Sequence, residues 1–280
     1  MIHEKPYRLA GVVGWPVAHS RSPLLHNHWL KKHHLPGAYV YLPVAPSKLE
    51  QALRGLPALG FAGCNVTIPH KIEAMRLADH VDPVARRIGA INTIVVEPDG
   101  TLAAHNTDVY GFLQCLQEGR PEWRAGDGPA VVVGAGGGAR AVVVALADAG
   151  VPEIRIVNRT DDRAKALADE FGGTVRAHAW RERHDVLGGA ALTVNTTSQG
   201  MKGQPPLDVD LSALPREAVV CDIVYTPLET PLLAAANARG NPTVGGLGML
   251  LHQARPGFEW WFGLRPEVTP ELRSMIEATI

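Results

Sequence analysis

Short apolar runs alternate with helix-like apolar spacing along the first hundred residues of the chain. A short apolar run bounded by turn residues predicts a strand, and apolar residues that recur every three or four positions predict a helix. The predicted strands are 9–14, 39–44, 61–66, 91–97 and 101–105, and the predicted helices are 23–32, 47–54 and 69–78. Ser22 and Thr67 are expected to cap the first and third of these helices. Strands that alternate with helices indicate an α/β sheet with crossover connections.

A second α/β pattern begins near residue 128, after the turn-forming residues 126–129. The run 130–133 is wholly apolar, which is typical of a strand buried on both faces of a parallel sheet. Further strands are predicted at 154–157, 190–194, 218–223 and 243–244, and helices at 139–148, 163–170, 231–238, 248–254 and from 269 onward. A length of 280 residues with two such patterns predicts two α/β domains.

Composition and charge narrow the class of protein. Lys and Arg number 27 and Asp and Glu 28, so no net positive charge favours nucleic acid or an anionic membrane surface. No apolar run approaches the roughly 20 residues of a membrane helix. Three cysteines without close spacing exclude a disulfide framework or a four-cysteine zinc site, and the histidines form no metal-binding motif. We therefore expect a soluble cytoplasmic protein with no metal.

A glycine-rich turn joins the apolar strand 130–133 to the following helix. Gly134 permits a tight turn, Gly136 lets a ligand approach the backbone, and Ala139 takes the third small position of a dinucleotide-binding fingerprint. The free N–H groups at the start of the helix would hold a pyrophosphate. A merely tight strand-to-helix turn is the alternative interpretation.

The residues after the next strand favour a phosphorylated ribose. An Asp or Glu there would accept a hydrogen bond from a free 2′-hydroxyl and favour NAD. The chain has instead Asn158, Arg159 and Thr160, followed by Arg163, and so offers two positive charges to a 2′-phosphate. The pattern predicts NADP. The alternative is a solvated helix face on which these arginines lie among Asp161 and Asp162.

Polar clusters in the first domain point to a substrate. Ser20 and Ser22 stand at a helix start, where N–H groups and the helix dipole favour a carboxylate, although Ser22 as a simple cap is the plainer interpretation. Lys71 is expected in the first turn of another helix, where the dipole disfavours an ammonium and so favours proton transfer. A solvated surface lysine is the alternative. Carboxylate, lysine, amide and hydroxyl groups together indicate a small polyhydroxylated acid.

Nine ordered motifs carry a resemblance to one family. They are HSRSP at 19–23, NVTIPHK at 65–71, GAINT at 89–93, NTD at 106–108, the glycine turn, NRT at 158–160, NTTSQGM at 195–201, DIVYTP at 222–227 and GLGMLLHQA at 246–254. On these motifs the chain resembles the shikimate dehydrogenases over essentially its whole length. The resemblance implies NADP-dependent, reversible reduction of 3-dehydroshikimate to shikimate in aromatic amino-acid biosynthesis. It also implies a substrate-binding domain of residues 1–106 and 246–280 and a Rossmann-type NADP-binding domain of residues 107–245.

The resemblance also implies roles for individual residues. Lys71 would be the proton donor and acceptor, with Asp108 paired beside it. The substrate would be held by Ser20, Ser22, Thr67, Lys71, Asn92, Asp108, Tyr225 and Gln253. The cofactor would be lined by Gly134, Ala135, Gly136, Gly137, Gly138, Asn158, Arg159, Thr160, Arg163, Ile223 and Gly246.

Two positions depart from the family pattern. Gly245 stands where many members have Asp, and Pro83 stands where many have an acidic residue, so both would loosen the positioning of the nicotinamide. The alternative functions are a paralogue that also accepts quinate and a catalytically inactive binding relative. The expected partner is a small-molecule substrate, with no nucleic acid and no membrane, and a homodimer is left open.

Overall fold

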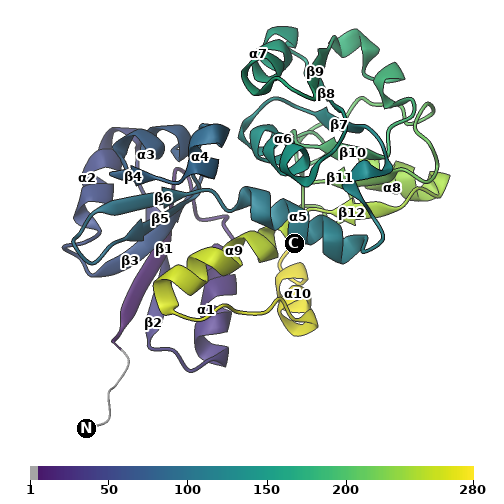
Figure 1. Ribbon diagram of the computed structural model, residues 1–280. Helices are drawn as coiled ribbons and strands as arrows, with labels where there is room; N and C mark the ends of the chain where they lie inside the picture. The colour runs from purple at the N-terminus through teal and green to yellow at the C-terminus, as the bar shows by residue number, and fades with distance from the viewer. Residues whose placement is uncertain (1–5) are drawn as a thin grey trace. The chain divides into compact units, whose positions relative to one another are not determined.

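The computed structural model describes residues 6–280, which form two compact units (Figure 1). The first unit contains the chain up to Thr107 together with Gln253–Thr279, and the second contains Asp108–His252. Helix α9 (Leu247–Phe262) spans the second boundary. The expected domain boundaries were 106/107 and 245/246, and the assignment of a binding function to each domain stays a prediction.

The first unit is built on a six-stranded sheet in the order β2-β1-β3-β5-β6-β4. Strands β1, β2 and β3 are parallel to one another, whereas β5 runs antiparallel to its neighbours β3 and β6. The elements are β1 (Arg8–Gly14), α1 (Ser22–Lys32), β2 (Gly37–Pro43), η1 (Pro46–Lys48), α2 (Leu49–Gly55), β3 (Phe61–Val66), α3 (Lys71–Leu77), β4 (His80–Val81), α4 (Pro83–Ile88), β5 (Thr93–Val96), β6 (Leu102–His105) and α10 (Pro270–Glu277).

The register of this sheet gathers several loops at one edge. Val13 of β1 is level with Val66 of β3, and Asn65 is level with Thr93, the first residue of β5. Thr93 is in turn level with His105 at the end of β6. The segments after β1, β3 and β6 and the segment before β5 therefore leave the sheet at the same edge.

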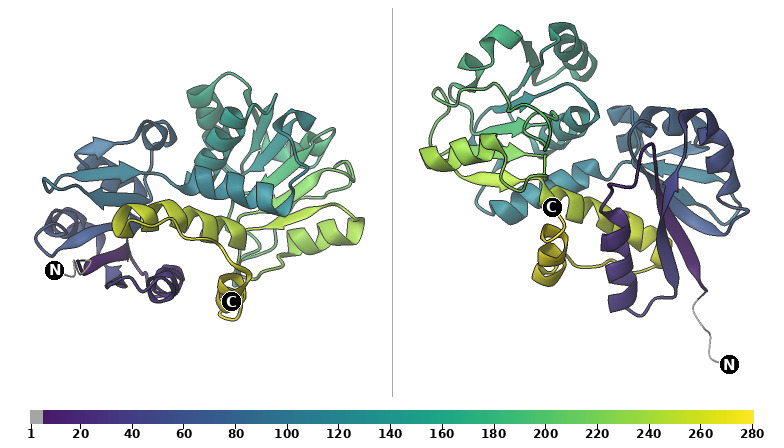
Figure 2. Two further views of the ribbon diagram at one scale, coloured as in Figure 1. Left: turned by 60° about the horizontal axis from the view of Figure 1, so that its bottom comes forward. Right: turned by 180° about the vertical axis from the view of Figure 1, so that it is seen from behind.

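An apolar layer on the sheet of the first unit packs residues of α2, α3 and α4 against β1, β3, β5 and β6. The indole N–H of Trp29 on α1 donates to the Glu267 carbonyl at 3.1 Å, and Arg21, the residue before α1, donates to the Thr279 carbonyl at 2.6 Å. The C-terminal segment thus returns to α1, beside which α10 lies (Figures 1 and 2).

The second unit is a doubly wound sheet in the order β12-β11-β10-β7-β8-β9, with every pair parallel. This order, 6-5-4-1-2-3 along the chain, is the Rossmann arrangement, with its switch point between β7 and β10. The elements are α5 (Asp108–Gly119), η2 (Ala125–Asp127), β7 (Ala130–Val133), α6 (Gly137–Ala149), β8 (Ile154–Val157), α7 (Asp161–Phe171), β9 (Val175–His178), η3 (Trp180–Glu182), η4 (Asp185–Leu187), β10 (Leu192–Asn195), β11 (Val219–Asp222), α8 (Pro231–Arg239) and β12 (Thr243–Gly245). The predicted α/β fold class is confirmed.

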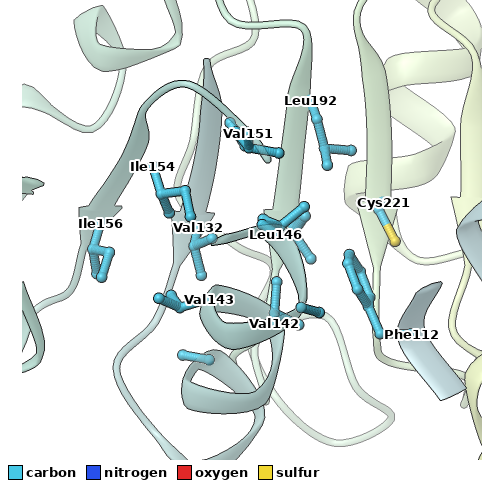
Figure 3. Packing of buried hydrophobic residues seen from close by; sticks show 14 of the residues in the cluster. Phe112, Val132, Val142, Val143, Leu146, Val151, Ile154, Ile156, Leu192 and Cys221 are labelled. Carbon is cyan, nitrogen blue, oxygen red and sulfur yellow. The ribbon is translucent and has the colours of Figure 1, made fainter. Parts of the chain in front are cut away.

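Alternate residues of β7 pack on opposite faces of this sheet, as expected for a strand buried on both sides. Val132 packs with Val142, Val143 and Leu146 of α6, as Figure 3 shows. Val131 and Val133 belong to the opposite layer, together with residues of α8 and η4. The chain can therefore turn sharply from β7 into α6 on a rigid support.

Two helix starts differ from the prediction. Ser22 is the first residue of α1 and not its cap, because Arg21 takes the cap position and the Ser20 hydroxyl accepts from the Ser22 N–H at 3.2 Å. Helix α3 begins at Lys71, two residues later than predicted, and Thr67 does not cap it. The Thr67 N–H instead donates to Val13 at 2.9 Å, which continues the strand pairing beyond β3.

Several elements were not predicted. Helices α4 and α5 and strands β4 and β9 lie in segments that the sequence analysis left unassigned, and α9 extends eight residues beyond the predicted helix 248–254. In α5, Phe112, Cys115 and Leu116 are buried at helical spacing. That periodic signal was present in the sequence and was missed.

Candidate active site

The loop after β1 carries two serines that are fixed by the surrounding chain. Ser20 donates its N–H to Val17 at 3.0 Å and accepts at its carbonyl from the Tyr41 hydroxyl at 3.1 Å. Its own hydroxyl receives the Ser22 N–H. Both serines are half-buried, and Ser22 is at the start of an eleven-residue helix whose dipole favours an anion.

The segment after β3 brings Thr67 and Lys71 to the same edge of the sheet. Gly14 allows the close approach, because a Cβ there would lie 2.6 Å from Cγ2 of Thr67. Lys71 is half-buried at the first position of α3, and its carbonyl accepts from the Ile91 N–H at 3.1 Å. Lys71 is therefore held next to the segment that contains Asn92.

A hydrogen-bond network lies beneath these residues. The Tyr39 hydroxyl donates to Oδ1 of Asn65 at 2.6 Å, and Nδ2 of Asn65 donates to the Asn92 carbonyl and to Oγ1 of Thr93, both at 3.1 Å. Burial raises the pKa of Tyr39 well above its usual value, so the phenol stays neutral. This network fixes the carboxamide of Asn65 and the backbone of Asn92.

Asn92 connects this network to the end of the first unit. Its Oδ1 accepts from the Thr107 N–H at 2.9 Å and from the Thr93 hydroxyl at 2.9 Å. Its Nδ2 donates to the Thr107 hydroxyl at 3.0 Å. Asp108 follows Thr107 directly and is the first residue of α5, so the backbone leading to this carboxylate is held in place.

His26 lies next to the network inside an aromatic cluster. Its ring stacks on Tyr39 with centroids 4.1 Å apart, and Trp29, Phe258 and Trp261 surround it. Neither ring nitrogen has a hydrogen-bond partner among residues 6–280. Burial, opposed by a smaller interaction with Asn65, lowers the pKa of His26 to about 3, so the ring is neutral.

In the second unit a pocket of about 250 Å³ lies at the switch point of the sheet. It is lined by residues that follow four strands: Gly134, Ala135, Gly136, Asn158, Arg159, Trp180, Thr196, Thr197, Ser198 and Gln199. Gly134 has φ of 115°, and a Cβ there would lie 2.5 Å from Oγ1 of Thr196, so only glycine fits. At Gly136 and Gly137 a Cβ would meet nothing within 4 Å. The open backbone at the start of α6, which has no side-chain cap, fits a pyrophosphate.

Asn158 and Arg159 follow β8 at the same edge. Nδ2 of Asn158 donates to the Thr160 carbonyl at 2.9 Å and shapes the turn into α7. Arg159 is exposed and lines the pocket, and Arg163 is exposed in the first turn of α7. Neither guanidinium has an ion-pair partner within the described part of the chain. Arg159 at the pocket and Arg163 in the first turn of α7 thus offer two cations that fit a 2′-phosphate.

A buried carboxylate organises the loops after β10 and β11. Oδ1 of Asp222 accepts from Nδ2 of Asn195 at 3.0 Å and from the Val224 N–H at 2.9 Å, and Oδ2 accepts from the Thr230 hydroxyl at 2.7 Å. Burial raises the pKa of Asp222, although these three hydrogen bonds oppose that effect. Asp222 thereby fixes the loop that carries Ile223 and Tyr225.

Three residues expected at the cofactor pack closely together. A Cβ on Gly138 would lie 2.8 Å from Cδ1 of Ile223, and one on Gly246 would lie 2.3 Å from the Ile223 carbonyl oxygen. The neighbouring Gly245 has more room, because the nearest atom to a Cβ there is 3.6 Å away. Pro83 is the first residue of α4 behind the cap residue Asp82, a position that suits proline.

The predicted site residues divide between the two units. Ser20, Ser22, Thr67, Lys71 and Asn92 lie at one edge of the first sheet. Gln253 lies on α9, while Asp108, Tyr225 and all the predicted cofactor residues belong to the second unit. The site roles themselves stay predictions.

Sequence reasoning missed several residues that shape these sites. Thr93 hydrogen-bonds to Asn92, and Tyr39 to Asn65, which in turn holds the backbone of Asn92. Asp222 holds the loop that carries Ile223 and Tyr225, and Trp180 and Thr196 line the pocket. Thr196 and Asp222 lie within two residues of the ends of the predicted strands 190–194 and 218–223, which was the available signal. Among residues 6–280 no group of three or more His, Cys, Asp or Glu could hold a metal ion. No helix in that range is long and apolar enough to cross a membrane.

Family models match three parts of the chain. The shikimate dehydrogenase substrate binding domain matches residues 12–94, the shikimate / quinate 5-dehydrogenase model matches residues 124–217, and the shikimate 5′-dehydrogenase C-terminal domain matches residues 246–270. The chain is 62% identical to the shikimate dehydrogenase (NADP(+)) of Paramagnetospirillum magneticum, over 96% of this chain and 98% of that protein.

Solved structures agree with the sequence comparison. Shikimate 5-dehydrogenase from Thermus thermophilus in complex with NADP(H) and shikimate is 37% identical, with a TM-score of 0.86 over 97% of this chain and 99% of that one. Quinate dehydrogenase from Corynebacterium glutamicum in complex with NAD is 34% identical, with a TM-score of 0.90 and the same coverage. The sequence motifs, the folds of the two units and these comparisons agree. The chain belongs to the shikimate dehydrogenase family.

Proposed function

We propose that the protein is an NADP-dependent shikimate dehydrogenase that reversibly reduces 3-dehydroshikimate to shikimate in aromatic amino-acid biosynthesis. The observation that favours NADP over NAD is the pocket beside Gly134 and Gly136. Arg159 lines this pocket without an ion-pair partner, at the position that contacts the adenosine ribose in dinucleotide-binding folds. An acidic residue would be needed there to favour a free 2′-hydroxyl. The relative from Paramagnetospirillum magneticum carries the same activity in its name.

The cofactor would be held by groups of the second unit. The open backbone of Gly136 to Gly138 would bind the pyrophosphate, Arg159 and Arg163 the 2′-phosphate, and Ile223 and Gly246 the nicotinamide side. When bound, NADPH supplies the hydride for reduction of a carbonyl carbon.

The chain's own groups would bind the acid and move the proton. Ser20 and Ser22 lie at a helix start that favours the substrate carboxylate, with Tyr225 as a further partner. Thr67, Asn92, Asp108 and Gln253 would hold ring hydroxyls. Lys71 would give its proton to the carbonyl oxygen in the reduction and take it back in the reverse direction, with Asp108 stabilising its charged form.

The test is reduction of the two nicotinamide cofactors with shikimate or quinate as the substrate. We expect NADP⁺ with shikimate to give the largest kcat/KM. Equal values for NADP⁺ and NAD⁺, or no turnover of shikimate, would contradict the proposal. A larger kcat/KM for quinate would favour the quinate dehydrogenase likeness, against which the greater identity to shikimate dehydrogenases counts.

A cytoplasmic location also belongs to this proposal. Its support is that Cys64, Cys115 and Cys221 are all buried and none of them is in a disulfide, as in a reducing compartment. Self-association as a homodimer stays a prediction.

A further inference from the structure

Trp180 lines the same pocket as Gly134 and Arg159, and neither a sequence motif nor the family resemblance assigns it a role. It is the first residue of η3, the short turn that follows the edge strand β9. Its register neighbours explain its position: His178 at the end of β9 is level with Val157, the last residue of β8, and Arg159 follows two residues later. The indole and the Arg159 guanidinium therefore come to the pocket from adjacent strands.

The indole is held in place before any ligand binds. The Arg183 guanidinium lies over its ring, 5.1 Å from the centroid, and Arg183 is itself fixed by Asp208 at 2.7 Å. The backbone N–H of Trp180 donates to Oδ1 of Asp161 at 2.8 Å, which ties η3, and not the ring itself, to the first turn of α7. Part of the side chain also packs on the apolar layer of Val131 and Val133.

A half-buried aromatic ring in a nucleotide pocket can bind the base of the nucleotide. Every nucleobase has a π-face that stacks on an aromatic side chain, and a ring that is already fixed loses little conformational freedom on binding. The phosphate-binding groups of this pocket are the backbone at Gly136 and the Arg159 side chain, neither of which offers a large apolar face for a base.

We propose that Trp180 is a cofactor-binding residue that packs against the adenine base, while Arg159 binds the 2′-phosphate of the same nucleotide. The inference rests on the proposed use of NADP. The inference assigns the two residues separate roles in cofactor binding. Trp180 contributes affinity for any adenine nucleotide, and Arg159 contributes the preference for the phosphorylated ribose.

The test distinguishes contacts with the adenine base from contacts with the 2′-phosphate. The full-length protein is titrated calorimetrically with adenosine 2′,5′-bisphosphate and with adenosine 5′-monophosphate, which lacks the 2′-phosphate. Trp180→Leu should weaken both ligands by the same factor, roughly ten-fold. Trp180→Phe should restore most of the affinity because it keeps an aromatic face. Arg159→Ala should weaken only the bisphosphate. The two losses of binding free energy for the bisphosphate should add in the double variant, since the two side chains contact separate parts of the ligand.

Fluorescence gives a second readout that does not depend on turnover. Adenosine 2′,5′-bisphosphate should change the indole emission of the wild-type protein, and Trp180→Phe should abolish that change. Trp123→Phe, a matched control whose ring packs on the other apolar layer of the same unit, should retain it.

Two results would overturn the inference. In one, Trp180→Leu binds both nucleotides like the wild type. In the other, its loss is confined to the bisphosphate, which would make Trp180 a support for Arg159 and not a contact for the base. Failure of the wild-type protein to bind the bisphosphate would instead overturn the proposed use of NADP, so the two failures are distinguishable.

Discussion

The carboxamide of Asn92 binds Thr107 at two points, through Oδ1 to the backbone N–H at 2.9 Å and through Nδ2 to the side-chain hydroxyl at 3.0 Å. Both residues are buried. Thr107 is the last residue before Asp108, so one side chain at the sheet edge controls the backbone from which the proposed catalytic carboxylate extends. Asn92 would therefore act on the chemistry through position as well as through a substrate contact.

Replacing Asn92 tests this positioning role. Asn92→Ala leaves the Thr107 N–H and hydroxyl without their partner, and we expect a loss of about 1–3 kcal/mol in the free energy of unfolding together with a lower kcat. Thr107→Ser keeps the hydroxyl and should be close to wild type in both. Chemical denaturation and steady-state kinetics measure the two effects. A normal kcat in Asn92→Ala would rule out control of Asp108 by this route.

Lys71 is expected to change kcat more than affinity. A group that moves a proton in the transition state contributes to kcat, whereas a group that binds ground and transition states equally changes KM. Lys71→Ala should lower kcat by about 10²–10⁴. Asp108→Asn should give a loss of the same kind, and the double variant should lose much less than the product of the two.

The Lys71 measurement combines steady-state kinetics with direct titration of shikimate. Lys48→Ala, at an exposed lysine in the same unit, is the control and should retain normal kinetics. A Lys71→Ala variant with near-normal kcat and weak shikimate binding would make this lysine a binding residue only.

Arg159 is expected to decide between the two cofactors. Loss of a charge-assisted contact with the 2′-phosphate costs roughly 1.5–3 kcal/mol, or about ten- to a hundredfold. Arg159→Ala should raise KM for NADP⁺ by this factor and leave KM for NAD⁺ nearly unchanged. Arg181→Ala, at an exposed arginine of η3, should change neither. Equal losses for both cofactors would refute a specific phosphate contact.

His26 should make the protein less stable in acid. Its pKa is about 3 in the folded protein against 6.5 for the ordinary side chain, so the unfolded chain binds the proton more readily between these values. Stability from this residue is complete above about pH 6.5 and falls as the pH drops toward 3, by about 2 kcal/mol between pH 7 and pH 5.

Substitution of His26 isolates this pH dependence. His26→Phe keeps a stacked ring on Tyr39 but cannot take up a proton, so its free energy of unfolding should vary less with pH over this range. His80→Gln, at an exposed histidine of the same unit, should follow the wild type. Denaturant titrations at several pH values give the comparison, and parallel curves for His26→Phe and wild type would disprove the effect.

The adjacent glycines Gly245 and Gly246 should differ in their tolerance of a methyl group. Gly246→Ala brings a Cβ to 2.3 Å from the Ile223 carbonyl oxygen, a backbone atom that cannot move aside cheaply. We expect a cost of roughly 3 kcal/mol and weaker NADP⁺ binding. Gly245→Ala has ordinary contact distances and should stay within about 0.5 kcal/mol of wild type. Thermal unfolding and NADP⁺ titration of the pair check this contrast.

The sequence by itself determined which residues end two strands of the second unit, β7 and β8. The predicted strands 130–133 and 154–157 coincide with β7 and β8. The first is apolar throughout, as a strand buried on both faces must be, and the second is apolar except for the half-buried Arg155. The glycine turn and Arg159 follow directly from them. Since parallel strands share one carboxyl edge, spacing along the chain was enough to predict that these groups meet there.

Only the tertiary structure decided which polar groups support the sites and what completes the pocket. The edge strand β9 carries exposed Arg176 and Ala177 and has no apolar signal, so Trp180 behind it could not be assigned from sequence. The Asn92–Thr107 and Asn195–Asp222 pairs depend on which strands lie side by side, and that order arises from packing between distant segments. Local periodicity reports how each element faces the core, whereas the partners of a buried polar group are set by the topology of the whole unit.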